Sequence, residues 1–273
     1  MSSKFSKAHE VTQHTSLEVK ATDIQYSSYS DWQAQDYLAE YYQEVMLDEV
    51  FTLEFILESL QKIPEVAIAL DFGCGPGVQQ ILPLVPKVQE IHLAEYLPAN
   101  RAEVEKWLTL QNDAYNWQAF TLETLRLQGN FNPTEVEALA HEQEVRNRTK
   151  RILPCDVTQA DPLGSEFRGF YPLVMSNYCA DAVSNSKESW RTYIKNIASL
   201  VKLGGVLLLS SCGSASFYRV GNRYFPGANI DEHDVLVCLQ DNNFTEINIQ
   251  VRQVPHNADQ GFSNVIFAYA VKR

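Results

Sequence analysis

Short apolar runs alternate with longer amphipathic segments along most of the chain. Strands alternating with helices predict βαβ units and a parallel sheet. The last two runs are separated by a short loop, which suits an antiparallel pair and not a crossover connection. The expected strands cover residues 66–73, 90–96, 151–157, 171–178, 205–212, 244–254 and 264–273.

This pattern predicts an α/β fold with a doubly wound, mostly parallel seven-stranded sheet and a C-terminal antiparallel hairpin. Residues 1–30 are polar and serine-rich and are expected to form a loop, followed by two helices up to Pro64. We therefore expect an N-terminal helical cap or lid over residues 1–63 and a core over 64–273, with an insertion at about 110–150.

Helix boundaries can also be proposed from the sequence. The segment that begins "NPTEVEALAHEQ" is expected to start with Asn132 as its N-cap, Pro133 in the first position and Glu135 behind it. Gly204 and Gly205 are expected to make the turn into the fifth strand.

Composition narrows the choice of partners. The 273 residues contain 22 Lys and Arg against 34 Asp and Glu, a net charge of −12, so binding to nucleic acid through its phosphates is not expected. The sequence lacks a long apolar run and a secretory h-region, so no membrane partner is expected. Five scattered cysteines without CxxC spacing favour a cytoplasmic protein without a metal site. We expect a monomer.

The stretch "ALDFGCGPGVQQ" is the clearest chemical motif. Gly73, Gly75 and Gly77 follow the first expected strand, where bare backbone lets a ligand approach closely. A dinucleotide loop would need a sixth-position glycine, but Val78 stands there, and Pro76 removes one N–H group. An NAD-dependent oxidoreductase is therefore disfavoured.

The pattern D-x-G-x-G-x-G resembles motif I of class I S-adenosylmethionine-dependent methyltransferases. The resemblance implies a Rossmann-like methyltransferase fold, S-adenosylmethionine as cofactor and S-adenosylhomocysteine as product. It also implies that Asp71 orders the loop and that Glu95, which stands 22 residues after Gly73, holds the ribose hydroxyls. Asp156 in "PCDV" would accept a hydrogen bond from the adenine amine, with Cys155 and Val157 packed on the ring.

A narrower resemblance rests on "QDYLAEYYQEV", "EYLPANRAEVEKWL", "RILPCDVTQADPLG" and "CADAV". These stretches are similar to the nicotinamide, phenylethanolamine and indolethylamine N-methyltransferases. That family implies cofactor contacts from aromatic and amide side chains, and an aromatic wall at Tyr218. The cofactor residues expected in full are Tyr37, Tyr42, Asp71, Gly73, Cys74, Gly75, Gly77, Glu95, Tyr96, Asn100, Cys155, Asp156, Val157, Asn177 and Tyr178.

The acceptor side departs from the family. A carboxylate often follows the fifth strand there, but this chain has "SSCGSAS". Other acids, including Asp234, are then candidates for holding an ammonium group and passing its proton to water. The expected catalytic residues are Tyr37, Asp181, Tyr218 and Asp259, and the expected substrate-binding residues are Tyr37, Tyr178, Ser211, Ser214, Tyr218, Glu232 and Asp259.

Together these features predict methyl transfer to the nitrogen of a small-molecule amine or N-heterocycle by in-line displacement. Catalysis would come from alignment and exclusion of water, so no cysteine nucleophile is expected. Two alternatives stay open at this point. The acceptor could be a thioether, thiol or hydroxyl group, or the chain could bind S-adenosylmethionine without turnover.

Overall fold

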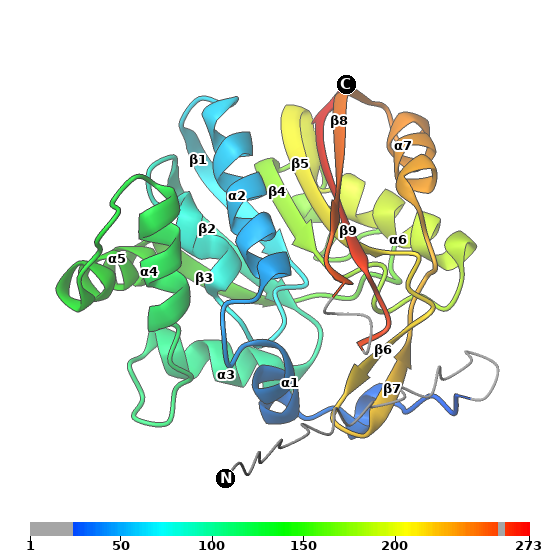
Figure 1. Ribbon diagram of the computed structural model, residues 1–273. Coiled ribbons are helices and arrows are strands. Elements are labelled where there is room, and N and C mark those ends of the chain that lie inside the picture. Colours follow the sequence, from blue (N-terminus) through cyan, green and yellow to red (C-terminus); the bar gives the residue numbers. More distant parts are fainter. Residues whose placement is uncertain (1–23, 256–259) are drawn as a thin grey trace, which may run out of the picture.

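Seven strands form one sheet in the order β3-β2-β1-β4-β5-β9-β8. The computed structural model describes residues 24–255 and 260–273 (Figure 1). β1 to β5 pair in parallel, whereas β9 runs antiparallel to both β5 and β8. The predicted fold class is therefore confirmed. The strands are β1 Val66–Phe72, β2 Val88–Glu95, β3 Thr149–Pro154, β4 Tyr171–Asn177, β5 Val201–Gly213, β8 Phe244–Gln253 and β9 Asn264–Lys272.

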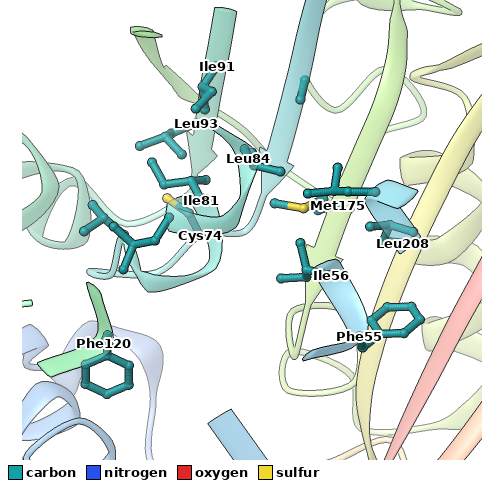
Figure 2. Packing of buried hydrophobic residues seen from close by; sticks show 14 of the residues in the cluster. Phe55, Ile56, Cys74, Ile81, Leu84, Ile91, Leu93, Phe120, Met175 and Leu208 are labelled. Carbon is teal, nitrogen blue, oxygen red and sulfur yellow. The ribbon is translucent and has the colours of Figure 1, made fainter. Parts of the chain in front are cut away.

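Helices cover both faces of the sheet, because alternate residues of the central strands point to opposite sides. Leu173 and Met175 of β4 pack into one hydrophobic cluster, and Val174 packs into the other. Figure 2 shows Met175 with Leu208 of β5 and Ile56 in the first cluster. The first face carries α2 Leu47–Gln61, α3 Pro98–Leu108, α4 Gln118–Leu127, α5 Glu135–Arg148 and the 3-10 helix η3 Gln79–Leu84, and the second carries α6 Lys187–Ala198 and α7 Glu232–Asp241.

An N-terminal segment, residues 24–42, lies across the end of the sheet, and we call it the strap. It contains the 3-10 helix η2 Tyr29–Asp31 and α1 Ala34–Tyr41. A two-stranded hairpin, β6 Phe217–Val220 and β7 Arg223–Pro226, lies beside it (Figure 1). The Tyr41 hydroxyl donates a 2.8 Å hydrogen bond to the carbonyl of Arg219, and the Arg219 guanidinium pairs with Glu40. The strap and the hairpin thus form one layer.

The second predicted N-terminal helix, α2, has a different environment. Its Phe55, Ile56 and Leu60 are buried in the first hydrophobic cluster, so α2 shares its core with the sheet. The boundary at residue 63/64 between a cap and a core stays a prediction. Within the described part of the chain, none of the helices combines the length and apolar character that a membrane crossing requires.

Several local predictions were wrong. α5 begins after Thr134, not Asn132, because Thr134 and Glu137 form a capping box in which each side chain accepts from the other's backbone N–H. The sequence reading also missed α4, α7 and the β6–β7 hairpin. Gly204, with φ +74°, lies inside β5 where its register against β4 shifts.

Candidate functional site

The glycine loop after β1 is tied to the end of β2. The backbone N–H of Gly73 donates a 2.8 Å hydrogen bond to the carbonyl of Ala94. Gly73 has φ +77°, and a Cβ there would lie 2.2 Å from Sγ of Cys179. A Cβ on Gly77 would lie 2.2 Å from Oε1 of Gln79. At both positions the surrounding packing leaves no room for a side chain.

Glu95, the last residue of β2, joins the glycine loop to the start of α3. Its Oε2 accepts a 3.0 Å hydrogen bond from the N–H of Gly75. Its Oε1 accepts from the N–H of Leu97 at 2.8 Å and from Nδ2 of Asn100 at 3.1 Å. Burial raises the pKa of Glu95, and these hydrogen bonds act against that rise. The carboxylate is thus held in one orientation beside the loop.

A cavity of about 360 Å³ opens between this loop, the strap and the β6–β7 hairpin. Most of the site residues that the sequence analysis proposed line this cavity. The expected site residues that line it are Tyr37, Tyr42, Gly73, Cys74, Gly75, Glu95, Tyr96, Asn100, Cys155, Asp156, Val157, Asn177, Tyr178, Asp181 and Tyr218.

The structure places the other expected residues elsewhere. Asp71 is buried beneath the loop, and burial, with the nearby charge of Glu95, raises its pKa to about 7. Ser211 is fully buried in β5, and Ser214 and Glu232 are exposed. Asp259 lies outside the described residues. None of these described side chains, nor Gly77, belongs to the cavity lining.

Asp234 has a structural explanation of its own. It accepts a hydrogen bond from the N–H of Asp231 in a capping box at the start of α7. Its carboxylate also pairs with Lys187 and Arg191. Because Lys187 and Arg191 belong to α6, these ion pairs join α7 to α6. Neither Asp234 nor its two partners line the cavity.

Aromatic rings of the strap cover the cavity. The Tyr37 ring lies 4.9 Å from Trp32 and 4.9 Å from Tyr41 between centroids, and its hydroxyl is 3.4 Å from that of Tyr42. Burial raises the pKa of Tyr37, so its hydroxyl stays protonated at neutral pH. Tyr41 also lines the cavity.

Polar groups at the end of β4 point into the same space. Oδ1 of Asn177 accepts a 2.6 Å hydrogen bond from Ser210, whereas its buried Nδ2 has no partner among the described residues. Tyr178 follows with φ +54°, and its hydroxyl lies 2.6 Å from Oγ1 of Thr52 in α2. The strained Tyr178 backbone thus positions a ring against α2.

Three carboxylates line the cavity in addition to those of Glu95 and Asp156. Oδ2 of Asp181 accepts a 2.8 Å hydrogen bond from the N–H of Cys212, and burial raises the pKa of Asp181 to about 6. The sequence analysis missed the other two, Asp48 and Glu49, which lie in the first turn of α2. Burial, and then the charge of Asp48, raises the pKa of Glu49.

The residues present fit S-adenosylmethionine. At Gly75 no atom lies within 4 Å of the Cβ position, so a ligand has room against the backbone there, and Glu95 is an acceptor beside it. The unpartnered Nδ2 of Asn177 supplies a buried donor to the same cavity. Neither a phosphate-binding lysine nor an arginine is among the described lining residues.

Solved structures show the same fold. A 1,6-didemethyltoxoflavin-N1-methyltransferase from Burkholderia thailandensis aligns with a TM-score of 0.52 and 16% identity, covering 92% of this chain and 93% of that one. An S-adenosylmethionine-dependent methyltransferase from Clostridium acetobutylicum aligns with a TM-score of 0.51 and 12% identity, covering 90% and 94%. At such identities the likeness concerns the fold alone.

Sequence comparison identifies the family. The chain is 26% identical to nicotinamide N-methyltransferase of Sus scrofa, over 88% of this chain and 92% of that protein. It is 28% identical to human phenylethanolamine N-methyltransferase, over 74% and 72% of the two chains. The family model described as the NNMT/PNMT/TEMT family matches residues 21–273. The chain therefore belongs to the NNMT/PNMT/TEMT family of S-adenosylmethionine-dependent N-methyltransferases.

Proposed function

We propose that this methyltransferase acts on a small cationic amine held in the cavity beneath the strap. The observation that carries the proposal is the charge of the cavity. Five carboxylates line it in the described part of the chain, and no Lys, Arg or His does. Carboxylates attract an ammonium group, and the faces of the surrounding aromatic rings favour a cation as well.

On the cofactor side, the proposed roles are those that the resemblance to the family implies, and the presence of these residues in the cavity lining supports them. Glu95 binds the ribose hydroxyls, and Asp156 binds the adenine amine between Cys155 and Val157. Nδ2 of Asn177, which has no partner among the described residues, donates to the amino-acid end of the cofactor. The remaining proposed cofactor contacts are Tyr37, Tyr42, Gly73, Cys74, Gly75, Tyr96, Asn100 and Tyr178.

On the acceptor side, Asp181 binds the ammonium group and removes its proton. Its Oδ2 is fixed by the N–H of Cys212, which leaves Oδ1 as the proton acceptor. Tyr37, Tyr178 and Tyr218 form the walls that hold the nitrogen in line. The pKa of about 6, raised by burial, lets Asp181 take a proton near neutral pH and release it to water.

When bound, S-adenosylmethionine supplies a methyl group that its sulfonium has already activated. Because that group would pass directly from sulfur to the acceptor nitrogen, the protein's own contribution would be to align the nitrogen between the tyrosine walls and to exclude water. The strap covers the cavity through Tyr37, Tyr41 and Trp32. It must therefore open to admit the acceptor and release products.

The experiment is transfer of a labelled methyl group from S-adenosylmethionine to a panel of matched acceptors. Benzylamine and phenethylamine would be compared with benzyl mercaptan, a thioether and a phenol of similar size. We expect label in the amines, and a loss of about 10²-fold in kcat/KM for Asp181→Asn. Label confined to sulfur or oxygen acceptors would contradict the proposal, as would tight binding of S-adenosylhomocysteine with no acceptor labelled.

A further inference from the structure

Two adjacent acids, Asp48 and Glu49, belong to the five carboxylates of the cavity, but the proposed function gives neither of them a role of its own. They lie in the first turn of α2, and their relative exposures are 7% and 4%. Both line the cavity, and Oε2 of Glu49 has no hydrogen-bond partner among the described residues. A buried carboxylate oxygen without a partner is costly, so this arrangement needs a compensating ligand or role.

Two contacts of Thr52 hold the start of α2, which carries Asp48 and Glu49, in place. Oγ1 of Thr52, one turn later in α2, donates a 2.7 Å hydrogen bond to the carbonyl of Asp48 and lies 2.6 Å from the Tyr178 hydroxyl. The start of α2 is thereby anchored against Tyr178 at the end of β4. The positive end of the helix favours negative charge in this first turn. Burial of Glu49 beside Asp48 opposes that charge, and a bound cation would relieve the opposition.

The cavity contains two separate groupings of acid and aromatic ring. The Tyr29 hydroxyl donates a 2.5 Å hydrogen bond to the carbonyl of Ala182, the residue after Asp181, and all three line the cavity. Burial raises the pKa of Tyr178, and the charges of Glu49 and Asp48 add to the rise. Each grouping offers a carboxylate beside an aromatic ring, which is the chemistry that binds an ammonium ion.

The thiol of Cys212 lines the same cavity as both groupings. Burial raises its pKa, and Asp181, Asp48 and Glu49 all raise it further. The backbone N–H of the same residue donates to Asp181. Because Asp181, Asp48 and Glu49 line a single cavity, both groupings face one continuous space.

We infer that Asp48 and Glu49 form a second cation subsite, and that the acceptor carries two cationic nitrogens. The inference rests on the proposed function: the nitrogen beside Asp181 is methylated, and the other is held beside Glu49 and Asp48. The substrate class is a compact diamine, either aliphatic or with an aromatic spacer that packs among the tyrosines. The second subsite selects the acceptor and positions it for transfer.

The test compares dications with monocations of the same length. The pairs are 1,4-diaminobutane with pentylamine, and 1,4-bis(aminomethyl)benzene with 4-ethylbenzylamine, each assayed with labelled S-adenosylmethionine. The measured quantity is the ratio of kcat/KM for the dication to that for its monoamine. Glu49→Gln and Asp48→Asn keep the side-chain shape, and Glu44→Gln is the control because Glu44 is exposed on the preceding loop. Thermal unfolding checks that each variant folds.

We expect the wild-type ratio to be at least about tenfold in favour of the dication, because a desolvated charge pair contributes strongly to binding. The ratio should fall by about tenfold in Glu49→Gln and stay at the wild-type value in Glu44→Gln. The Kd for S-adenosylhomocysteine is the second readout. If Glu49→Gln weakens that Kd and leaves the ratio intact, the pair serves the ammonium of the cofactor and the inference is overturned.

The remaining outcomes separate the inference from the proposed function. Methyl transfer to the monoamines with no preference for the dications would overturn the second cation subsite and leave the proposed function standing. No methyl transfer to any amine, with S-adenosylhomocysteine still bound, would overturn the proposed function itself. Failure of Glu49→Gln to fold would leave Asp48→Asn to decide the ratio.

Discussion

The indole Nε1 of Trp32 donates a 2.9 Å hydrogen bond to Oδ1 of Asn100. The amide of Asn100 in turn donates to Glu95, and Glu95 accepts from the N–H of Gly75. A residue of the strap is thus joined through two side chains to the glycine loop. Closure of the strap and the orientation of the Glu95 carboxylate, which we propose binds the ribose, are therefore expected to depend on each other.

Replacing Trp32 tests this connection. Trp32→Phe keeps a ring but removes the donor to Asn100, so Glu95 is held less firmly. We expect the Kd for S-adenosylhomocysteine to rise about threefold to tenfold, the value of one hydrogen bond. Calorimetric titration measures it. Tyr26→Phe is the matched control, because it also removes one hydrogen bond of the strap, to the carbonyl of Ser216 outside the cavity lining. Equal losses in both variants would contradict the connection.

The glycine loop gives a second prediction. A Cβ at Gly73 would require a left-handed backbone and would meet Cys179, so Gly73→Ala should lower the free energy of unfolding by about 2–4 kcal/mol. Gly129, with φ +100°, has no atom within 4 Å of its Cβ position, so Gly129→Ala should cost only the backbone strain, about 1–2 kcal/mol. Urea unfolding compares the two, and equal losses would show that the contact with Cys179 is unimportant.

The pH dependence of catalysis should report Asp181. Burial raises its pKa to about 6, and only the ionised carboxylate can accept the amine proton. The value of kcat/KM should therefore fall as the pH drops through about 6, in addition to any change from titration of the acceptor. Asp181→Asn should abolish that inflection and keep the one that belongs to the acceptor.

The control for this profile is Glu188→Gln, because Glu188 is exposed on α6. Its profile should match the wild type. An inflection near pH 6 that persists in Asp181→Asn would assign the titration to another group. It would also remove Asp181 from the role of proton acceptor.

The parallel sheet, and the convergence of the proposed cofactor residues on one cavity, were predictable from the sequence because each depends on local order. The apolar runs alternate with helices, and Gly73, Glu95 and Asp156 each end or follow a parallel strand. The carboxyl ends of parallel strands meet at one edge of the sheet, so these residues converge. The capping box of α5 also has a sequence signal, because Glu137 follows Thr134 by three residues. The sequence analysis proposed Asn132 as the N-cap instead.

The acceptor side was harder to predict because its residues come from elements joined only by tertiary packing. The hairpin signal was present, since Gly221 and Asn222 form a two-residue turn between Val220 and Arg223. The acidic pair also left a signal. The buried positions Leu60, Ile56 and Leu53 of α2, followed back by helical steps, lead to Glu49. That the start of α2 meets Tyr178, through Thr52, follows only from the docking of α2 on the sheet.

The proposal that this cavity binds S-adenosylmethionine is tested most directly by calorimetric titration. Wild type and Glu95→Gln are each titrated with S-adenosylhomocysteine and, separately, with NADH. The carboxylate accepts from Gly75 and Leu97 through both of its oxygens, and an amide can accept through only one. We predict saturable binding of S-adenosylhomocysteine alone, weakened at least about tenfold in Glu95→Gln. Binding of NADH, or equal affinity of the variant for S-adenosylhomocysteine, would contradict the assignment of this cavity.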